Sequence, residues 1–261
     1  MVEPVETPVR RDPLVPEVIP DDPTALAEHL LIGLRQRANP DNVAGMARYG
    51  ISPEGTLGVQ IPVLRGVVRE LRAVRRSRPD YVHEVAAVLW ASGVHEARML
   101  AGFLDVPELV TQAQADVWVA GFDSWDVCDQ VTGLFASTPF APALVARWTA
   151  SSEVFTKRAG FVLICALAVH DKEAPDEALT AYLPLIEAAA VDDRTYVKKA
   201  VNWALRQIGK RSLTCHAAAV EAAERILRDH PDSRCARWIA RDALRELRSD
   251  AVRQRLARSR A

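Results

Sequence analysis

A carboxylate and an aromatic side chain come together in residues 124–129, which read Ser-Trp-Asp-Val-Cys-Asp. On a helix, Trp125 and Asp129 are neighbours on one face, whereas Asp126 points about 100° away. An aromatic face beside a carboxylate can form a pocket for a positively charged ligand. The structural alternative makes Asp123 and Asp126 acids favoured at a helix start, and Trp125 a core residue. That alternative leaves Asp129 unexplained, because it lies beyond the first turn.

A second candidate is a tryptophan in the middle of a basic stretch, residues 196–211. On a helix turning about 100° per residue, four side chains form a narrow stripe opposite an apolar face. They are Lys199, Trp203, Arg206 and Lys210. No acid occurs between Arg194 and Arg211. An exposed tryptophan among cations is typical of a surface for an anionic partner with flat rings, such as nucleic acid.

The elements that position these residues are predicted to be helices. From Pro62 onward the apolar residues recur at helical spacing, and no alternating pattern marks a strand. Asp22-Pro23-Thr24 is expected to begin the first helix, and Pro107 to occupy the first turn of a later one. Five of the predicted helices cover residues 64–76, 81–90, 95–104, 110–119 and, after an N-cap at Asp123-Ser124, the segment through Leu134.

A weak repeat links three basic groups, residues 157–159, 198–200 and 236–238, each of which opens an apolar helix. Arg158 and Lys199 are 41 residues apart, and Lys199 and Arg237 are 38 apart. HEAT repeats have periods of about 40 residues, and stacked repeats line one wall with their second helices. We therefore predict an all-α curved solenoid of HEAT-like antiparallel helical repeats with a basic concave groove. The alternative is that these groups are solvated helix faces.

Composition sets the remaining limits. The net charge of −1 means that any basic site must come from local clustering rather than from the whole chain. Four widely spaced cysteines indicate reduced thiols, and no metal site or cofactor is expected. No apolar run is long enough for a membrane span, so a cytoplasmic protein is expected. We also expect a monomer. Residues 1–22, rich in proline and acids, are predicted to be a disordered leader before a single domain over 23–261.

Four motifs resemble the AlkD-like DNA alkylation repair glycosylases. Two are residues 124–129 and residues 197–211, which read Val-Lys-Lys-Ala-Val-Asn-Trp-Ala-Leu-Arg-Gln-Ile-Gly-Lys-Arg. The others are residues 89–98 (Leu-Trp-Ala-Ser-Gly-Val-His-Glu-Ala-Arg) and 58–65 (Gly-Val-Gln-Ile-Pro-Val-Leu-Arg). The resemblance covers about residues 24–248. It implies a curved stack of HEAT-like repeats that holds duplex DNA, excises purines alkylated at N3 or N7, and works in the bacterial cytosol or nucleoid.

The resemblance also implies roles for single residues. The catalytic aspartate of the family corresponds to Asp129, and its two active-site tryptophans to Trp125 and Trp203. Its active-site arginine corresponds to Arg158, although Lys157 is adjacent. DNA phosphates are expected to contact Lys157, Lys198, Lys199, Arg206, Lys210 and Arg211.

These residues predict a monofunctional glycosylase for duplex DNA containing cationic alkylated purines. Asp129 would stabilise the oxocarbenium-like sugar and position water, while Trp125 and Trp203 face the deoxyribose. The lesion is expected to stay stacked in the duplex. Two alternatives remain open: a non-catalytic DNA-binding solenoid for damaged or branched DNA, and a HEAT module whose basic wall binds an acidic protein.

Overall fold

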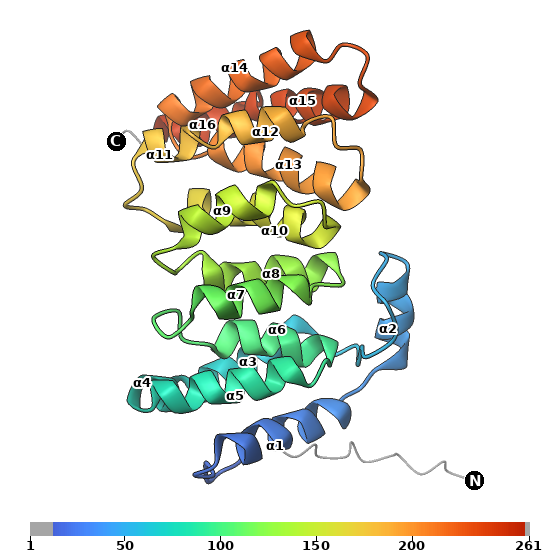
Figure 1. Cartoon of the computed structure of the whole chain (residues 1–261), viewed down its shortest axis with the longest axis vertical. Helices are drawn as coiled ribbons and strands as arrows, with labels where there is room; N and C mark the ends of the chain where they lie inside the picture. Colours follow the sequence, from blue (N-terminus) through green and yellow to red (C-terminus); the bar gives the residue numbers. More distant parts are fainter. Residues whose placement is uncertain (1–12, 259–261) are drawn as a thin grey trace, which may run out of the picture. The chain divides into compact units, whose positions relative to one another are not determined.

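The computed structural model describes residues 13–258 of the chain, and all of its regular elements there are helices (Figure 1). This confirms the all-α prediction. The chain forms two compact units, with the boundary between Val106 and Pro107. Within the described residues, no helix is long and apolar enough to cross a membrane. The prediction of a single domain over 23–261 stays a prediction.

In its described part, residues 13–106, unit 1 contains six helices. They are α1 (Pro23–Arg35), α2 (Pro40–Ala47), α3 (Ile61–Glu70), α4 (Arg72–Ser77), α5 (Pro79–Ala91) and α6 (His95–Leu104). Asp22 caps α1 by accepting from the Thr24 amide, and a proline follows the cap, as the sequence predicts. The packed core of this unit is built mainly from α1, α5 and α6.

Part of the predicted leader packs against the helices of unit 1. Leu14 is buried and lies over Gly33, where an added Cβ would meet it at 2.6 Å. The Tyr81 hydroxyl donates to the carbonyl oxygen of Pro20 at 2.7 Å. Residues 13–22 are therefore tied to α1 and α5. Residues 1–12 of the predicted leader lie outside the described residues.

One buried carboxylate joins two of the sequence motifs in unit 1. Glu96, which is fully buried, accepts from the backbone amides of Leu57, Gly58 and Val59 at 2.9, 2.6 and 3.1 Å. Gly58 has a φ of +76°, a conformation that favours glycine. Motifs 58–65 and 89–98 therefore fix a loop to α6, which gives them a structural role.

Two predicted helix boundaries are wrong. The segment 64–76 is divided into α3 and α4, because the backbone leaves helical geometry at Leu71, with φ −81° and ψ 2°. Pro107 does not occupy the first turn of a helix. It lies in a turn before Thr111, whose hydroxyl accepts from the Gln114 amide and so starts the next helix, α7, at Gln112.

Unit 2 contains ten helices over residues 107–258, the part of it that the structure describes. They are α7 (Gln112–Ala120), α8 (Trp125–Phe135), α9 (Ala141–Thr149), α10 (Val154–His170), α11 (Asp176–Thr180), α12 (Leu183–Ala189), α13 (Thr195–Ile208), α14 (Leu213–Asp229), α15 (Arg234–Leu247) and α16 (Asp250–Arg258). The pairs α9/α10, α12/α13 and α14/α15 pack together, and α8, α10, α13 and α15 pack in succession (Figure 1). This arrangement is that of stacked helical pairs.

Two glycines permit the close approach of these helices. An added Cβ at Gly160 of α10 would lie 2.6 Å from the Thr149 amide nitrogen at the end of α9. At Gly209, after α13, it would lie 2.7 Å from the Leu247 side chain of α15. Because backbone and core atoms occupy that space, larger residues would push the helix pairs apart.

The three basic groups of the predicted repeat lie in helices that pack in succession. Residues 157–159 belong to α10, 198–200 to α13, and 236–238 to α15. This confirms that the repeat marks equivalent helices of successive pairs. The concave groove stays a prediction.

Candidate functional site

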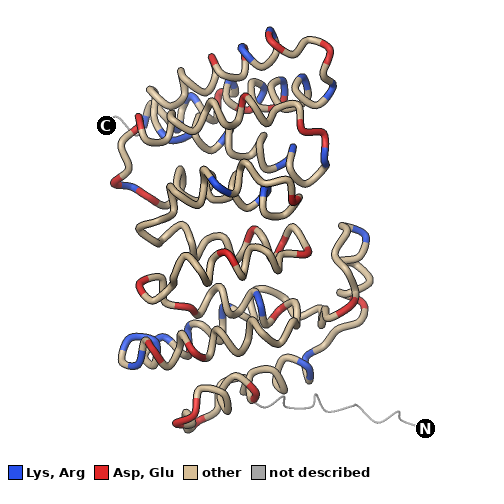
Figure 2. Tube along the Cα trace, in the orientation of Figure 1, with Lys and Arg blue, Asp and Glu red and all other residues tan. Residues whose placement is uncertain are grey.

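The side chains around Trp203 line a hollow of about 350 Å³ in unit 2. We call it the α13 hollow. Its lining comes from α10, α13 and α15: Arg158, Lys199, Asn202, Trp203, Arg206, Trp238 and Asp242. Trp203 is half-buried at this hollow, so the sequence was right to place it away from the core face. Figure 2 marks the Lys and Arg residues along α13 and α15.

Asp129 is not among the residues that line this hollow, but it pairs with Arg158, which lines it. The Arg158 guanidinium donates from Nε to Oδ1 and from Nη2 to Oδ2, both at 2.8 Å. Its Nη1 donates to the Tyr196 carbonyl oxygen at 2.7 Å. The pair therefore connects α8, α10 and the first turn of α13. Arg158 and Trp203 line the same hollow, so the arginine links the predicted aspartate to the predicted tryptophan.

The side chains of this pair are largely withdrawn from solvent, at 13% exposed for Asp129 and 6% for Arg158. Burial raises the pKa of Asp129 above its ordinary value, although the hydrogen bonds and charge of Arg158 oppose that shift. Burial lowers the pKa of Arg158, but its hydrogen bonds to Asp129 and the charge of that carboxylate together outweigh burial and raise the pKa. Such a two-point pair fixes the carboxylate in one orientation.

The predicted stripe of Lys199, Trp203, Arg206 and Lys210 lies on α13 and the turn after it, and we call it the α13 stripe. Two of its cations are matched by acids from α15. Glu246 accepts from Arg206 and, at 2.6 Å, from Lys210 Nζ. Burial raises the pKa of Glu246, but the hydrogen bonds from Lys210 and Arg206 reverse the shift and hold it below its usual value. Asp242 lies 4.0 Å from Arg206 Nε. The stretch 194–211 contains no acid, but the helix packed against it supplies two.

Other predicted phosphate ligands also have protein partners. Lys157 Nζ lies 3.1 Å from Asp192 Oδ2. Hydrogen bonding from Arg194, the largest cause, lowers the pKa of Asp192 to about 2. Arg211 donates to the carbonyl oxygens of Ala168, Lys172 and Ala174. It ties the turn after α13 to the end of α10.

Two lysines remain at the surface of α13. Lys199 is exposed at the α13 hollow, and no ion pair is recorded for it within residues 13–258. The Lys198 ammonium lies 5.6 Å from the centre of the Trp238 ring. Their predicted role in holding phosphates stays a prediction. Among the described residues, no cluster of three or more His, Cys, Asp or Glu is arranged to hold a metal ion.

The structure does not place Trp125 in the lining of the α13 hollow. Trp125 is the first residue of α8 and is half-buried. Ser124 begins that helix with extended backbone, but its hydroxyl makes no capping hydrogen bond. Cys128, next to Asp129, is fully buried, and burial raises the pKa of its thiol well above the usual value. That thiol is therefore held in its neutral form.

The sequence missed Trp238, Asn202 and Asp242 as lining residues. Asn202 is buried and donates from its side-chain amide to the Ile239 carbonyl oxygen at 3.0 Å, which joins α13 to α15. The sequence signal that could have identified Trp238 is the spacing of the cations around it. Trp203 has cations four residues before it and three and seven residues after it, and Trp238 has arginines at the same three positions.

Packed helical pairs with a basic hollow around a tryptophan define a helical-repeat protein of the HEAT-like kind. Consistent with this, the profile of the DNA alkylation repair enzyme family matches residues 30–247. The chain therefore belongs to the DNA alkylation repair enzyme family.

One solved structure to which the chain is similar is described as "A new family of proteins related to the HEAT-like repeat DNA glycosylases with affinity for branched DNA structures". The TM-score is 0.62 and the identity 19%, over 76% of this chain and 81% of that chain. At this identity the likeness shows the fold. None of the curated proteins gives a significant match.

Proposed function

We propose that the protein is a DNA glycosylase that hydrolyses the N-glycosidic bond of purines alkylated at N3 or N7 in duplex DNA. The observation that carries this proposal is the carboxylate of Asp129, fixed by Arg158 next to the hollow that contains Trp203. Membership of the DNA alkylation repair enzyme family supports the same reaction.

The substrate explains why this site needs a carboxylate but no general acid. A purine alkylated at N3 or N7 carries a positive charge and leaves readily as a neutral base. As the C1′–N bond breaks, its electron pair goes to the base nitrogen and positive charge develops on the sugar. Only contacts that strengthen during that shift accelerate the reaction, so the site must stabilise the sugar cation.

Asp129 retains the capacity to do this while paired with Arg158. A carboxylate has about four lone-pair positions, and Arg158 occupies two of them. The remaining positions can accept from a water molecule and direct its oxygen towards C1′. A charge about 4 Å from the sugar cation would contribute about 4 kcal/mol at an effective dielectric near 20. When water adds to C1′, its proton passes to Asp129 or to solvent.

Trp203 would pack on the deoxyribose beside Asp129, where its ring face attracts the developing cation by about 0.5–2 kcal/mol. The same role is proposed for Trp125 at the start of α8. The lesion would remain stacked, because the two lining residues suited to read a base edge, Asn202 and Asp242, are already engaged by protein partners. Lys198 and Lys199 would hold phosphates, which positions the duplex without reading its sequence.

The test is release of free base from duplexes that contain 3-methyladenine, 7-methylguanine or a bulky N3 or N7 adduct. We expect release from all cationic lesions and none from the same duplex with unmodified purines. Absence of release from every lesion, with intact duplex binding, would contradict the proposal.

A second candidate is a DNA-binding protein without catalysis. The two-point pairing of Asp129 with Arg158 favours it, since a carboxylate neutralised by a guanidinium attracts a sugar cation less strongly. The similar solved structure is described as having affinity for branched DNA. This candidate predicts salt-sensitive binding of branched or damaged duplex and no base release. A protein-binding module predicts instead that duplex DNA is not retained even at low salt.

A further inference from the structure

A stripe on α15 repeats the residue pattern of the α13 stripe. Its members are Arg234, Trp238, Arg241 and Arg245, each 35 residues after Lys199, Trp203, Arg206 and Lys210, respectively. The apolar positions correspond as well, since Ala204 and Ile208 match Ile239 and Ala243, and all four are buried. The two segments therefore share one spacing of a tryptophan and three cations, combined with an apolar face.

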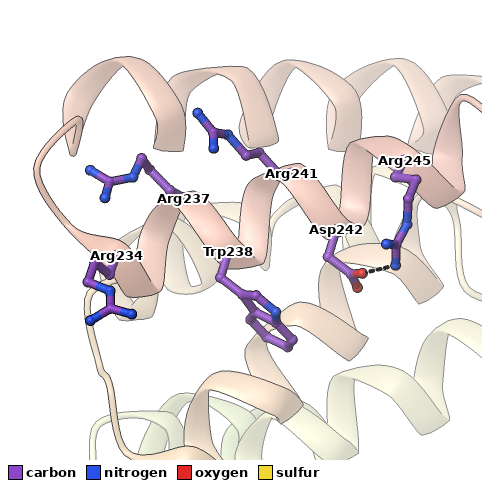
Figure 3. A pocket seen from close by; sticks show the side chains of 6 residues that line it. All are labelled: Arg234, Arg237, Trp238, Arg241, Asp242 and Arg245. Atoms are coloured by element: carbon purple, nitrogen blue, oxygen red, sulfur yellow. Dashed lines mark hydrogen bonds and ion pairs between the residues drawn. The ribbon is translucent and has the colours of Figure 1, made fainter.

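The α15 stripe lines a second hollow, of about 460 Å³, with Arg237 and Asp242 (Figure 3). Trp238 and Asp242 project to one side of α15, whereas Arg237 and Arg241 project from the other (Figure 3). Trp238 is 43% exposed and also contributes to the α13 hollow. It therefore stands where the two hollows meet, with one large aromatic side chain available to a ligand.

Charge distinguishes this hollow from the first. Four arginines line it together with a single acid, Asp242, which pairs with Arg245. No ion pair is recorded for Arg234 or Arg241 within residues 13–258, and both are exposed. The ammonium of Lys198 adds a further cation beside the Trp238 ring. Such an excess of positive charge selects an anionic ligand.

The exposed ring of Trp238 favours an anion that also carries an accessible aromatic face. Bases inside a duplex are covered on both faces by their neighbours, whereas an unpaired base presents a face that can stack on an indole. The arginines from Arg234 to Arg245 extend over about 16 Å of helix, at about 1.5 Å per residue, which suits a run of phosphates. An acidic peptide would satisfy the arginines but has no need of an exposed flat ring.

We propose that the α15 stripe binds an unpaired segment of DNA, with a base stacked on Trp238 and the phosphates on Arg234 and Arg241. This inference rests on the proposed DNA-binding function, but it assigns to α15 a surface that base excision itself does not need. With both surfaces occupied, the protein would bind a duplex that adjoins a single-stranded segment.

The experiment compares binding of a blunt duplex with binding of the same duplex carrying a single-stranded oligo(dT) tail. Because stacking of one base contributes about 1–3 kcal/mol, the intact protein should prefer the tailed duplex by about tenfold. Trp238→Ala should remove that preference, and Trp238→Phe, which keeps a ring, should retain part of it. Arg241→Gln should weaken the tailed complex several-fold, whereas Arg253→Gln, which removes an exposed arginine of α16, should change it by less than about twofold.

Three results would overturn the inference. They are equal binding of both duplexes by the intact protein, a tail preference that survives Trp238→Ala, and a loss on Trp238→Ala that is equal for both duplexes. Displacement of DNA by poly-glutamate without any tail preference would assign the stripe to an acidic protein instead. A failure of the proposed function can be distinguished from a failure of this inference. Base release by Asp129→Asn tests the proposed function, whereas this variant should keep the preference for the tailed duplex.

Discussion

The α13 and α15 stripes have the same spacing of a tryptophan and three cations, yet their surroundings differ. In the α13 stripe, Arg206 and Lys210 are paired with Glu246, and the adjacent Arg158 is paired with Asp129. In the α15 stripe, Arg234 and Arg241 are exposed and unmatched by recorded ion pairs within residues 13–258. The side chains of Arg206 and Lys210 are 26% and 16% exposed, against 80% for Arg245.

The difference in pairing and exposure suits the two stripes to different kinds of ligand contact. Paired and partly buried cations hold a fixed geometry, which a reacting centre requires. Exposed arginines keep their charge available to any phosphate but fix no single position. We therefore propose that excision belongs to the α13 hollow and adaptable strand binding to the α15 stripe.

The largest expected effect is on stability, from Arg158→Ala. This change leaves the Asp129 carboxylate buried without its partner, which should lower the free energy of unfolding by about 3–5 kcal/mol. Arg241→Ala on the exposed α15 stripe is the matched control and should change it by less than about 0.5 kcal/mol. Urea unfolding measures both. Equal effects would show that the Asp129–Arg158 pair at the α13 hollow stabilises the fold no more than an exposed arginine of the α15 stripe does.

The free energy of unfolding should also decrease at acid pH, because Asp192 forms ion pairs with Lys157 and Arg194. Its folded pKa of about 2 lies below the value near 3.9 expected for the unfolded chain, so its contribution is complete above about pH 4. As the pH falls towards 2, about 2 kcal/mol should be lost. Asp192→Asn should lack this contribution at neutral pH. Parallel pH curves for the two proteins would contradict the pairing.

Trp203→Ala should slow base release about tenfold, because the ring face would no longer attract the developing sugar cation. Trp203→Phe keeps an aromatic face and should recover most of that rate. Single-turnover kinetics separate this effect from binding. If Trp203→Ala alters only the affinity for DNA, then the α13 tryptophan acts like its α15 counterpart and the division between the stripes fails.

The smallest effect concerns the acids that α15 contributes. Glu246→Gln removes the charge that pairs with Arg206 and Lys210, so duplex affinity at low salt should rise about threefold. Glu224→Gln removes an acid from an exposed pair with Arg248 on the surface and is the matched control. Titration by fluorescence anisotropy at two salt concentrations checks both. An equal rise in the two variants would reflect net charge alone.

The sequence predicts the helices well where caps and periodicity agree, as at Asp22 and Pro23, and it places Trp203 off the core face. It fails at Pro107, because a proline also suits the turn before a Thr cap. These local signals decide helix boundaries but not what faces a helix from another part of the chain.

The pairing of charges could not be read from the sequence. Asp129 and Arg158 are 29 residues apart, and Lys210 and Glu246 are 36 apart, so their contacts depend on how helices stack. Residues 194–211 contain no acid, so the sequence alone indicates an unpaired basic surface. In the structure, Glu246 of α15 pairs with two cations of this segment. In the sequence, Trp238 resembles Trp203 only in the spacing of the cations around it. That spacing indicates a shared surface only once α13 and α15 are known to line the same hollow.

The most direct test of the account is the single-turnover rate of 7-methylguanine release by the intact protein and by Asp129→Asn. The asparagine keeps the size of the side chain but loses the charge that would stabilise the sugar cation. We predict a rate at least about a hundredfold lower, the scale seen when one electrostatic contact to a transition state is removed, with duplex binding retained. Release by Asp129→Asn at the rate of the intact protein would contradict the central role of this carboxylate.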